Sequence, residues 1–289
     1  MAILWTITLL WAFSFSLIGE YLSGQVDSWF AVTSRAALAM LVFLPWLLRT
    51  PLRPLLVARL MGIGAVQLGV MYVCFYNAFA FLSVAEVALF TVLTPLWITV
   101  LEDVARRRFS PRYLLAAALA VMAGVVMRAQ TPDNQWLSGF LLIQAANLCF
   151  ALGQVAWRRL VHGGDLGSTP QHAVFGWFFA GALLVSLLGS LIWGDYQQRP
   201  STAVQWGILL WLGVVASGLG YCLWNQAATQ VSAGTLAVMN NALVPAAILV
   251  NLAVWQQPAP ILPLLTGSAL LLLALWIGRA KNSIPLSRA

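Results

Sequence analysis

Hydrophobic residues run along this chain in ten long stretches that are separated by short polar connections. Each stretch has about the 20 apolar residues that an α-helix needs to cross a bilayer. The ten stretches are residues 2–19, 29–48, 59–81, 84–101, 112–128, 136–157, 172–194, 205–228, 233–255 and 261–278. The pattern therefore predicts an all-α, polytopic membrane protein with ten transmembrane helices.

One part of the sequence occurs twice. Residues 64–88 and 213–237, which are 149 positions apart, share seven identical residues in 25. The shared residues are Gly64/Gly213, Val66/Val215, Gly69/Gly218, Tyr72/Tyr221, Ala78/Ala227, Ser83/Ser232 and Ala88/Ala237. After a one-residue slip, Pro95 and Pro245 also correspond. Gly69, Gly218 and Gly220, together with Gly62 and Gly64, are predicted to let helices pack closely.

The repeat divides the chain into two halves of five predicted helices each. The polar segment around residues 131–135 separates them, so we assign residues 1–131 and 132–280 to the two repeats and 281–289 to a tail. Because five is an odd number, the second half enters the membrane from the opposite side. The prediction is an inverted repeat, an arrangement typical of transporters whose substrate site lies between the halves.

Composition places the chain in a membrane and argues against a nucleic-acid partner. Soluble domains carry about 25% charged residues, whereas this chain is 61% hydrophobic and 8% charged, with a net charge of +7. The basic residues cluster in the predicted loops, with twelve on one side and two on the other. The twelve are Arg49, Arg53, Arg59, Arg106, Arg107, Arg108, Arg112, Arg158, Arg159, Arg279, Lys281 and Arg288. The positive-inside rule then places both termini in the cytoplasm, as expected for a bacterial inner-membrane protein.

The sequence shows no arrangement typical of catalysis or of a bound metal. It has no Ser-His-Asp, Cys-His or paired-carboxylate pattern, and Cys74, Cys149 and Cys222 all lie inside apolar stretches. We therefore expect no catalytic residues, no metal site and no cofactor. An intramembrane enzyme would have to use Arg35 and Glu86, the two charged residues that lie inside the predicted spans and not at their ends.

Arg35 and Glu86 each have two interpretations. An ionisable group inside a membrane is costly and usually functional. Arg35 is predicted either to bind a substrate carboxylate or to cap carbonyls or pair with an acid. Glu86 is predicted either to couple transport to protons or to stabilise the N-terminus of its helix, where the dipole favours an anion.

Aromatic and hydrogen-bonding residues gather on the predicted helices that carry the repeat. Pro95 and Pro245 each free a backbone carbonyl one turn earlier, and paired helix interruptions point to a site near the membrane midplane. The candidate substrate-binding residues are Trp11, Ser14, Arg35, Tyr72, Tyr76, Phe90, Thr94, Asn147, Tyr221, Trp224, Asn225, Asn240 and Asn241. Further candidate lining positions on the same helices are Phe15, Gln67, Met71, Phe75, Thr91, Gln154 and Ser217. Together they indicate an aromatic cavity with amide groups, suited to a neutral, flat ring.

Both halves of the chain resemble EamA domains of the drug/metabolite transporter superfamily. Within it, VQLGVMY (66–72), LFTVLTPLWIT (89–99), QWGILLWLGVVASGLGY (205–221) and AGTLAVMNN (233–241) resemble the biotin permeases of the carboxylate/amino acid/amine transporter family. The resemblance implies a central cavity lined by helices 1, 3, 4, 6, 8 and 9, with biotin as the small-molecule substrate. It implies no obligatory protein partner.

Biotin would make three demands on such a cavity. Its ureido ring needs donors and acceptors, which Asn147, Asn225, Asn240 or Asn241 offer. Its carboxylate needs Arg35 or, failing that, the hydroxyls of Tyr76 or Thr94, and its apolar part needs aromatic walls. An exporter of amino acids, metabolites or drugs on the same fold, and an accessory subunit of a larger importer, remain the alternatives.

Overall fold

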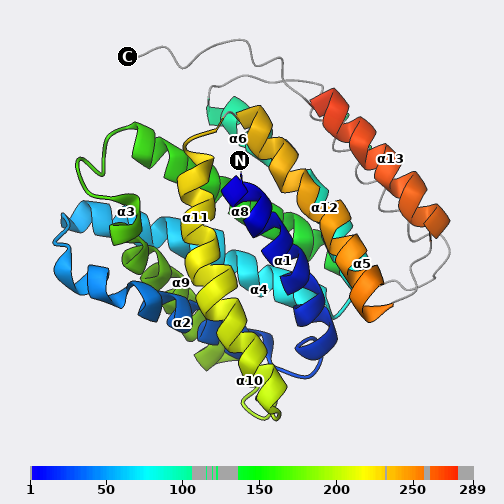
Figure 1. Ribbon diagram of the computed structural model, residues 1–289, viewed down its shortest axis with the longest axis horizontal. Helices are drawn as coiled ribbons and strands as arrows, with labels where there is room; N and C mark the ends of the chain where they lie inside the picture. The colour runs from blue at the N-terminus through cyan, green and yellow to red at the C-terminus, as the bar shows by residue number, and fades with distance from the viewer. Residues whose placement is uncertain are drawn as a thin grey trace.

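The computed structural model of the protein describes residues 2–105, 115, 119, 122, 136–231, 233–256 and 261–278. These residues form α-helices joined by short connections, and Figure 1 shows the helices packed against one another as a bundle. Most of the predicted fifth helix at 112–128, the boundary around 131–135 and the tail at 281–289 lie outside the described residues.

The described residues up to Ala105 form four helical segments, which we call crossings and number in the predicted order. They are α1 (Ala2–Tyr21), α2 (Ser28–Arg49), a third built from α3 (Pro54–Gly64), η1 (Ala65–Val70) and α4 (Met71–Ala78), and a fourth built from α5 (Val84–Phe90), η2 (Thr91–Leu93) and α6 (Thr94–Ala105). The predicted spans agree with these bounds within a few residues at most ends. The third crossing starts five residues earlier than predicted, at Pro54, whose missing N–H is tolerated in a first helical turn.

The described residues from Trp136 onward form five further helical segments, which are numbered sixth to tenth in the same way. They are α8 (Trp136–His162), α9 (Gln171–Trp193), an eighth built from α10 (Ala203–Leu210), η3 (Trp211–Leu219) and α11 (Gly220–Ala228), then α12 (Ala233–Trp255) and α13 (Ile261–Gly278). Six helices in the described part of the chain are long and apolar enough to cross a membrane, and two shorter apolar helices span Val84–Ile98 and Ala242–Trp255. The chain is therefore a multi-pass membrane protein.

The third and eighth crossings are interrupted at the same place in the repeat. Both contain a π-helical segment, η1 and η3, and these end at Val70 and Leu219, which are 149 residues apart (70 + 149 = 219). A π-helical segment changes the hydrogen-bond spacing along the backbone, and such segments are frequent at functional sites. Equivalent sequence in the two halves thus folds into equivalent local structure.

The fourth crossing is interrupted at Pro95, as predicted. Pro95 has no N–H to donate to the carbonyl of Thr91, and the backbone forms a short 3₁₀ helix over Thr91–Leu93. The hydroxyl of Thr94 lies 2.7 Å from the Thr91 carbonyl oxygen and replaces the missing donor. The interruption predicted at Pro245 is wrong, because α12 passes this proline as one continuous helix.

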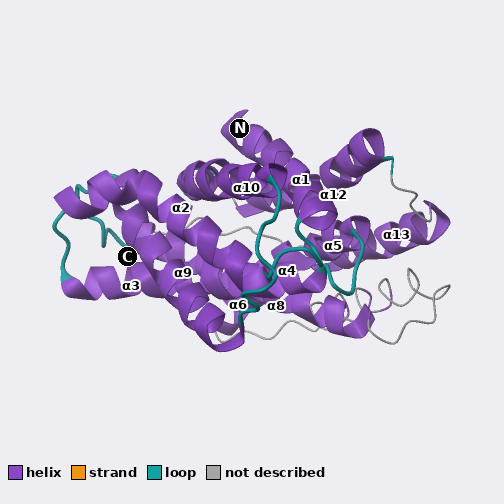
Figure 2. Ribbon diagram, turned by 90° about the horizontal axis from the view of Figure 1, so that it is seen from below, coloured by secondary structure: helices purple, strands orange, loops and turns teal. Residues whose placement is uncertain are grey.

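Helices α2 and α9 lie side by side and run in opposite directions. The ring of Trp46 lies 5.7 Å from that of His172 near one end, and the ring of Trp29 lies 5.5 Å from that of Trp193 near the other. Elsewhere α1 packs against both α11 and α12, and α8 packs against α4 and α6. Figures 1 and 2 show α13 at the edge of the bundle.

Glycines allow close helix contacts at equivalent places in the two halves. A side chain at Gly64 or Gly69 would collide with or press on the backbone of α9, and one at Gly213 or Gly218 would meet α2. The predicted packing role of Gly64, Gly69 and Gly218 is confirmed, as is that of Gly220, where a Cβ would lie 3.2 Å from the indole nitrogen of Trp11 on α1. The same prediction for Gly62 is wrong, because a Cβ built there meets nothing within 4 Å.

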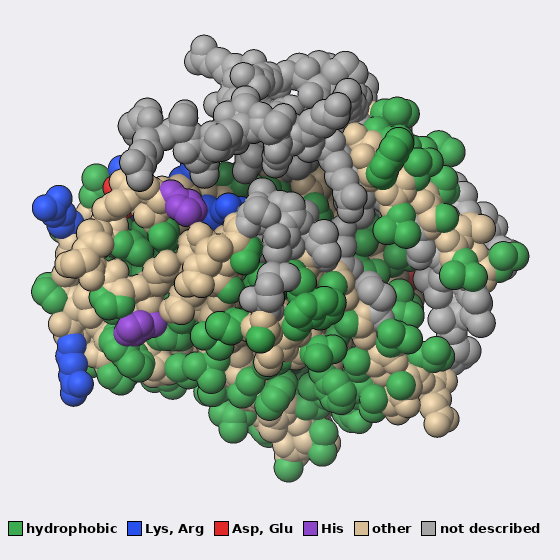
Figure 3. Space-filling view, turned by 45° about the horizontal axis from the view of Figure 1, so that its top comes forward, with side chains coloured by type: hydrophobic (Ala, Val, Ile, Leu, Met, Phe, Trp, Pro, Cys, Tyr) green, Lys and Arg blue, Asp and Glu red, His purple; other side chains and the backbone are tan. Residues whose placement is uncertain are grey.

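The described surface matches a lipid environment. Hydrophobic side chains cover much of the face in Figure 3, and the Lys and Arg side chains visible there lie toward the left of that view. Leu191, Ile192 and Trp193 are among the large apolar residues that are more than half exposed. Exposed apolar area of this extent is stable only against a bilayer or a partner.

Candidate substrate cavity

A cavity opens between the two halves of the bundle. The space between its lining residues measures about 690 Å³ when the part that is open to solvent is counted. Eight predicted site residues line it: Trp11, Ser14, Arg35, Tyr72, Thr94, Asn147, Tyr221 and Asn240. The other lining residues are Phe15, Ile18, Met71, Phe75, Thr91, Ala146, Phe150 and Leu243.

Arg35 on α2 is held by hydroxyl groups from other crossings. Its Nε and Nη2 donate to Ser217 Oγ at 3.1 and 2.9 Å, Nη1 donates to the Tyr76 hydroxyl at 3.0 Å, and Nη2 donates to the Tyr72 hydroxyl at 3.0 Å. The guanidinium carbon also lies 4.0 Å from the centre of the Tyr72 ring, a distance typical of a cation–π contact. These contacts fix the cation at the cavity wall.

The positive charge of Arg35 has no carboxylate partner among the described residues. The ion pair found there joins Arg59 to Asp165 at 3.2 Å, on exposed side chains. Arg35 itself is only 3% exposed. A buried charge is normally paired, and the four hydrogen bonds to neutral hydroxyls use four of the five guanidinium N–H groups. The wall is therefore suited to an anion that enters the cavity.

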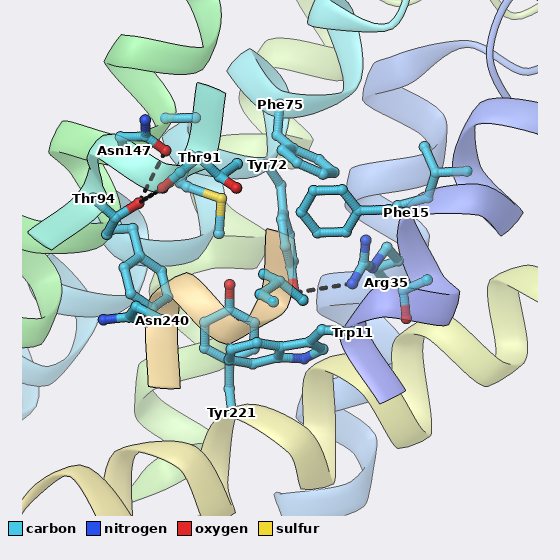
Figure 4. A pocket seen from close by; sticks show the side chains of 16 residues that line it. Trp11, Phe15, Arg35, Tyr72, Phe75, Thr91, Thr94, Asn147, Tyr221 and Asn240 are labelled. Carbon is cyan, nitrogen blue, oxygen red and sulfur yellow. Dashed lines mark hydrogen bonds between the residues drawn. The ribbon is translucent and has the colours of Figure 1, made fainter. Parts of the chain in front are cut away.

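A second polar group lies away from Arg35, on the other side of the cavity in Figure 4. The Asn147 amide donates to the carbonyl of Phe90 at 2.9 Å, and its oxygen lies 3.1 Å from the Thr94 hydroxyl. Asn240 also lines the cavity, and its amide nitrogen has no hydrogen-bond partner among the described residues. This end offers both donors and acceptors to a neutral ligand.

Aromatic rings lie between the two polar ends. The rings of Trp11 and Tyr221 are 4.8 Å apart, and those of Phe15 and Phe75 are 4.9 Å apart in an edge-to-face arrangement. The Trp11 indole is fixed because its N–H donates to the backbone carbonyl of Ala216 at 2.9 Å. Figure 4 shows Trp11, Tyr72 and Tyr221 between Arg35 and the polar residues Asn147 and Asn240.

Several predicted site residues lie behind the cavity wall. Phe90, Trp224 and Asn225 are at most 1% exposed and are not lining residues. Trp224 supports the cavity by packing its ring 4.9 Å from that of Trp11. Tyr76 contributes through its bond to Arg35, and the side chain of Asn241 lies outside the described residues.

Phe150 and Ala146 are lining residues that the sequence reasoning did not single out. Phe150 comes one helical turn after Asn147, so helical spacing places both on one face of α8. The signal was present, but in an apolar helix a phenylalanine facing the cavity looks the same as one facing lipid.

Glu86 is placed as a helix cap. Its carboxylate accepts from the Ser83 N–H and the Ser83 hydroxyl, both at 2.8 Å, and its own N–H donates back to the Ser83 oxygen. This capping box begins α5, and Glu86 is not among the residues that line the cavity. The arrangement supports the stabilising interpretation of Glu86.

We expect Glu86→Gln to leave the response of uptake to an imposed pH gradient unchanged. Glutamine serves equally well in a capping box, and Gln205 already does so for α10 together with Thr202. Uptake into membrane vesicles with and without the gradient measures the effect. Loss of gradient-driven uptake with retained exchange would instead assign Glu86 the coupling role.

Comparison with known proteins defines the class. A profile of the EamA-like transporter family matches residues 1–129 and again residues 137–278. The chain belongs to this family, so it is a transporter and not an enzyme.

Two curated relatives cover nearly the whole chain. The biotin transporter of Escherichia coli strain K12 is 48% identical over 281 residues, which cover 96% of this chain and 93% of the relative. The probable biotin transporter of Pseudomonas aeruginosa strain PAO1 is 48% identical over 94% of this chain and 95% of the relative. A protein of known crystal structure shares the fold, with a TM-score of 0.64 at 20% identity over 96% of this chain and 95% of that one.

Proposed function

We propose that this protein imports biotin across the bacterial inner membrane through the cavity between its two halves. The observation that carries the proposal is Arg35, a buried cation that faces the cavity and has no carboxylate partner among the described residues. Biotin supplies the missing carboxylate. The relatives that are 48% identical over almost the full chain support the same substrate.

The two ends of the cavity match the two ends of biotin. We assign the carboxylate to Arg35 and the hydroxyls around it, and the ureido ring to Asn147 and Asn240. The thiophane ring and the valeryl chain then lie against aromatic rings such as those of Trp11 and Tyr221. Asn241 adjoins Asn240 on α12 and remains a candidate for the same ureido group.

Three observations support two inverted halves that rock around this site. The family profile matches the chain twice, with the break at residues 130–136. The second crossing of each half, α2 and α9, are antiparallel neighbours. On α8, Gly153 adjoins Gln67 while Gly139 adjoins Leu82, so α8 is antiparallel to the third crossing that contains η1 and α4. Alternating access follows from such an arrangement.

The loop charges support both termini on the cytoplasmic side. Arg49, Arg53 and Arg59 flank the connection between α2 and α3, and Arg158 and Arg159 lie at the end of α8. On this orientation, import carries biotin from the cavity toward the end of the bundle that holds these arginines.

Thermal stabilisation of the purified protein tests the substrate. A ligand that binds only the folded state at a hundred times its Kd stabilises that state by about 2.7 kcal/mol. We expect biotin to raise the melting temperature, and lipoate, which has the same carboxylate chain but no ureido ring, to have no effect. Equal stabilisation by lipoate or by aromatic amino acids would contradict the assignment.

An exporter is the alternative that one comparison favours. The pseudopaline exporter CntI of Pseudomonas aeruginosa strain UCBPP-PA14 is 28% identical over 175 residues, 59% of this chain and 58% of the relative. Growth of a biotin-requiring strain at trace biotin distinguishes the two directions. Import predicts that the protein supports growth, whereas a metabolite exporter leaves the strain without biotin.

A further inference from the structure

Three amide side chains are buried behind the cavity without hydrogen-bond partners. Gln67 and Asn225 are 0% exposed and Gln154 is 1% exposed. All six of their side-chain nitrogen and oxygen atoms lack a partner among the described residues. A buried amide that satisfies neither its donor nor its acceptor is costly in a folded protein.

The three amides lie one turn beyond the cavity, in the same direction on three helices. Gln154 follows the lining residue Phe150 by four positions on α8, and Asn225 follows Tyr221 by four on α11. Gln67 precedes the lining residue Met71 by four positions. Because its crossing runs antiparallel to α8, Gln67 lies on the same side of the cavity as Gln154. We call Gln67, Gln154 and Asn225 the amide tier.

Packing contacts link the members of the amide tier. Gly153 has no side chain, so Gln67 packs directly on α8 beside Gln154; a Cβ at Gly153 would lie 2.2 Å from Gln67 Cβ. One turn further, the Trp157 indole N–H donates to the backbone carbonyl of Asn225 at 3.3 Å. The tier therefore joins α8 both to the third crossing and to α11.

Three aromatic rings that line the cavity, two of them one helical turn before Gln154 and Asn225, form what we call the aromatic floor. It consists of Trp11, Phe150 and Tyr221, whose ring centres are 4.8 Å apart for Trp11 and Tyr221, 6.4 Å for Trp11 and Phe150, and 6.1 Å for Phe150 and Tyr221. The two ends of the floor belong to opposite halves of the chain, so relative movement of the halves parts Trp11 from the other two rings.

We propose that the amide tier is a second, transient binding site for the ureido ring of the substrate on the way to the cytoplasm. This rests on the proposed import of biotin. Three amides offer both donors and acceptors, which a cyclic urea requires and a hydrocarbon does not. The groups are unpaired while the aromatic floor is closed and acquire partners when it opens.

Replacing the amides by apolar side chains separates this role from a structural one. For Gln154→Met and Asn225→Leu we expect unchanged biotin affinity at the central cavity and a melting temperature equal to or above that of the unmodified protein. The initial rate of uptake should fall about tenfold in each variant. Loss of one hydrogen bond to the passing substrate raises the barrier to transport by about 1.4 kcal/mol, which is a factor of ten in rate. Asn251→Leu, at a buried polar site on α12 and outside the amide tier, is the matched control and should transport normally.

Each other outcome has a distinct meaning. Normal uptake by both variants would overturn the amide tier as a transport site. So would a structural result, in which Gln154→Met lowers the melting temperature while Gln154→Asn, which keeps an amide, has the normal melting temperature but the same uptake rate as Gln154→Met. Failure of the unmodified protein to bind biotin at all would instead overturn the proposed function, because that measurement does not involve the tier.

Discussion

Arg35→Gln is expected to lower the affinity for biotin by about a hundredfold or more and to abolish measurable uptake at low biotin. Removing one partner of a buried, hydrogen-bonded charge pair costs about 2–5 kcal/mol, and each 1.4 kcal/mol is about a factor of ten in affinity. The guanidinium faces the cavity and is held in place by Ser217, Tyr72 and Tyr76. Equilibrium binding of labelled biotin to the purified variant measures the loss.

The neutral amide of biotin is the matched ligand for this variant. If Arg35 binds the carboxylate, the unmodified protein prefers biotin to biotin amide, and Arg35→Gln removes the preference because it weakens only the charged ligand. Loss of affinity by the same factor for both ligands, together with a lower melting temperature, would assign Arg35 a structural role. Tyr76→Phe, which removes the hydroxyl at 3.0 Å from Nη1, should have a smaller effect of the same kind.

Gly64→Ala is expected to be the most destabilising single-methyl change in the described bundle. A Cβ at Gly64 would lie 1.7 Å from the carbonyl oxygen of Phe178, on the backbone of α9, so the third crossing and α9 must separate. Over-packing of this kind costs about 1–3 kcal/mol or more, and in a membrane the close approach of helices is itself a main source of stability. The melting temperature of purified protein and the yield of monodisperse protein measure it.

Gly62→Ala is the control for Gly64→Ala, two residues earlier on the same helix. A Cβ at Gly62 meets nothing within 4 Å, and alanine favours a helix over glycine by about 0.5–1 kcal/mol. We expect Gly62→Ala to be neutral or slightly stabilising. Equal loss of stability in both variants would mean that the contact between α3 and α9 does not carry the effect.

The membrane helices were predictable because a single requirement, apolar length, fixes them. The bounds of α12 (Ala233–Trp255) and α13 (Ile261–Gly278) are those read from the sequence, and α2 starts one residue before its predicted position because Asp27 caps it by accepting from the Phe30 N–H. The 3₁₀ interruption at Pro95 was also predictable, since a proline removes a known hydrogen bond.

The π-helical segments could not be predicted in this way. No proline marks η1 or η3, and what the two segments share is the repeat sequence and glycines such as Gly69 and Gly218 at close contacts with the other half. Their conformation depends on helices distant in the sequence. The sequence pattern along one segment does not show which distant helices that segment will contact.

The site was predictable as a set of helices but not residue by residue. Asn147 and Phe90 both lie in apolar crossings, yet one lines the cavity and the other is fully buried behind it. The sequence left two roles open for Arg35. We propose substrate binding because Arg35 lines the cavity and no carboxylate in the described chain neutralises it.

Uptake of labelled biotin into liposomes that contain only the purified protein tests the central claim most directly. We predict accumulation that unlabelled biotin suppresses and that lipoate and biotin amide do not. Liposomes with the Arg35→Gln variant should accumulate no more biotin than empty ones. The account is contradicted if the unmodified protein takes up no biotin either under an imposed ion gradient or under exchange conditions. It is also contradicted if Arg35→Gln takes up as much biotin as the unmodified protein.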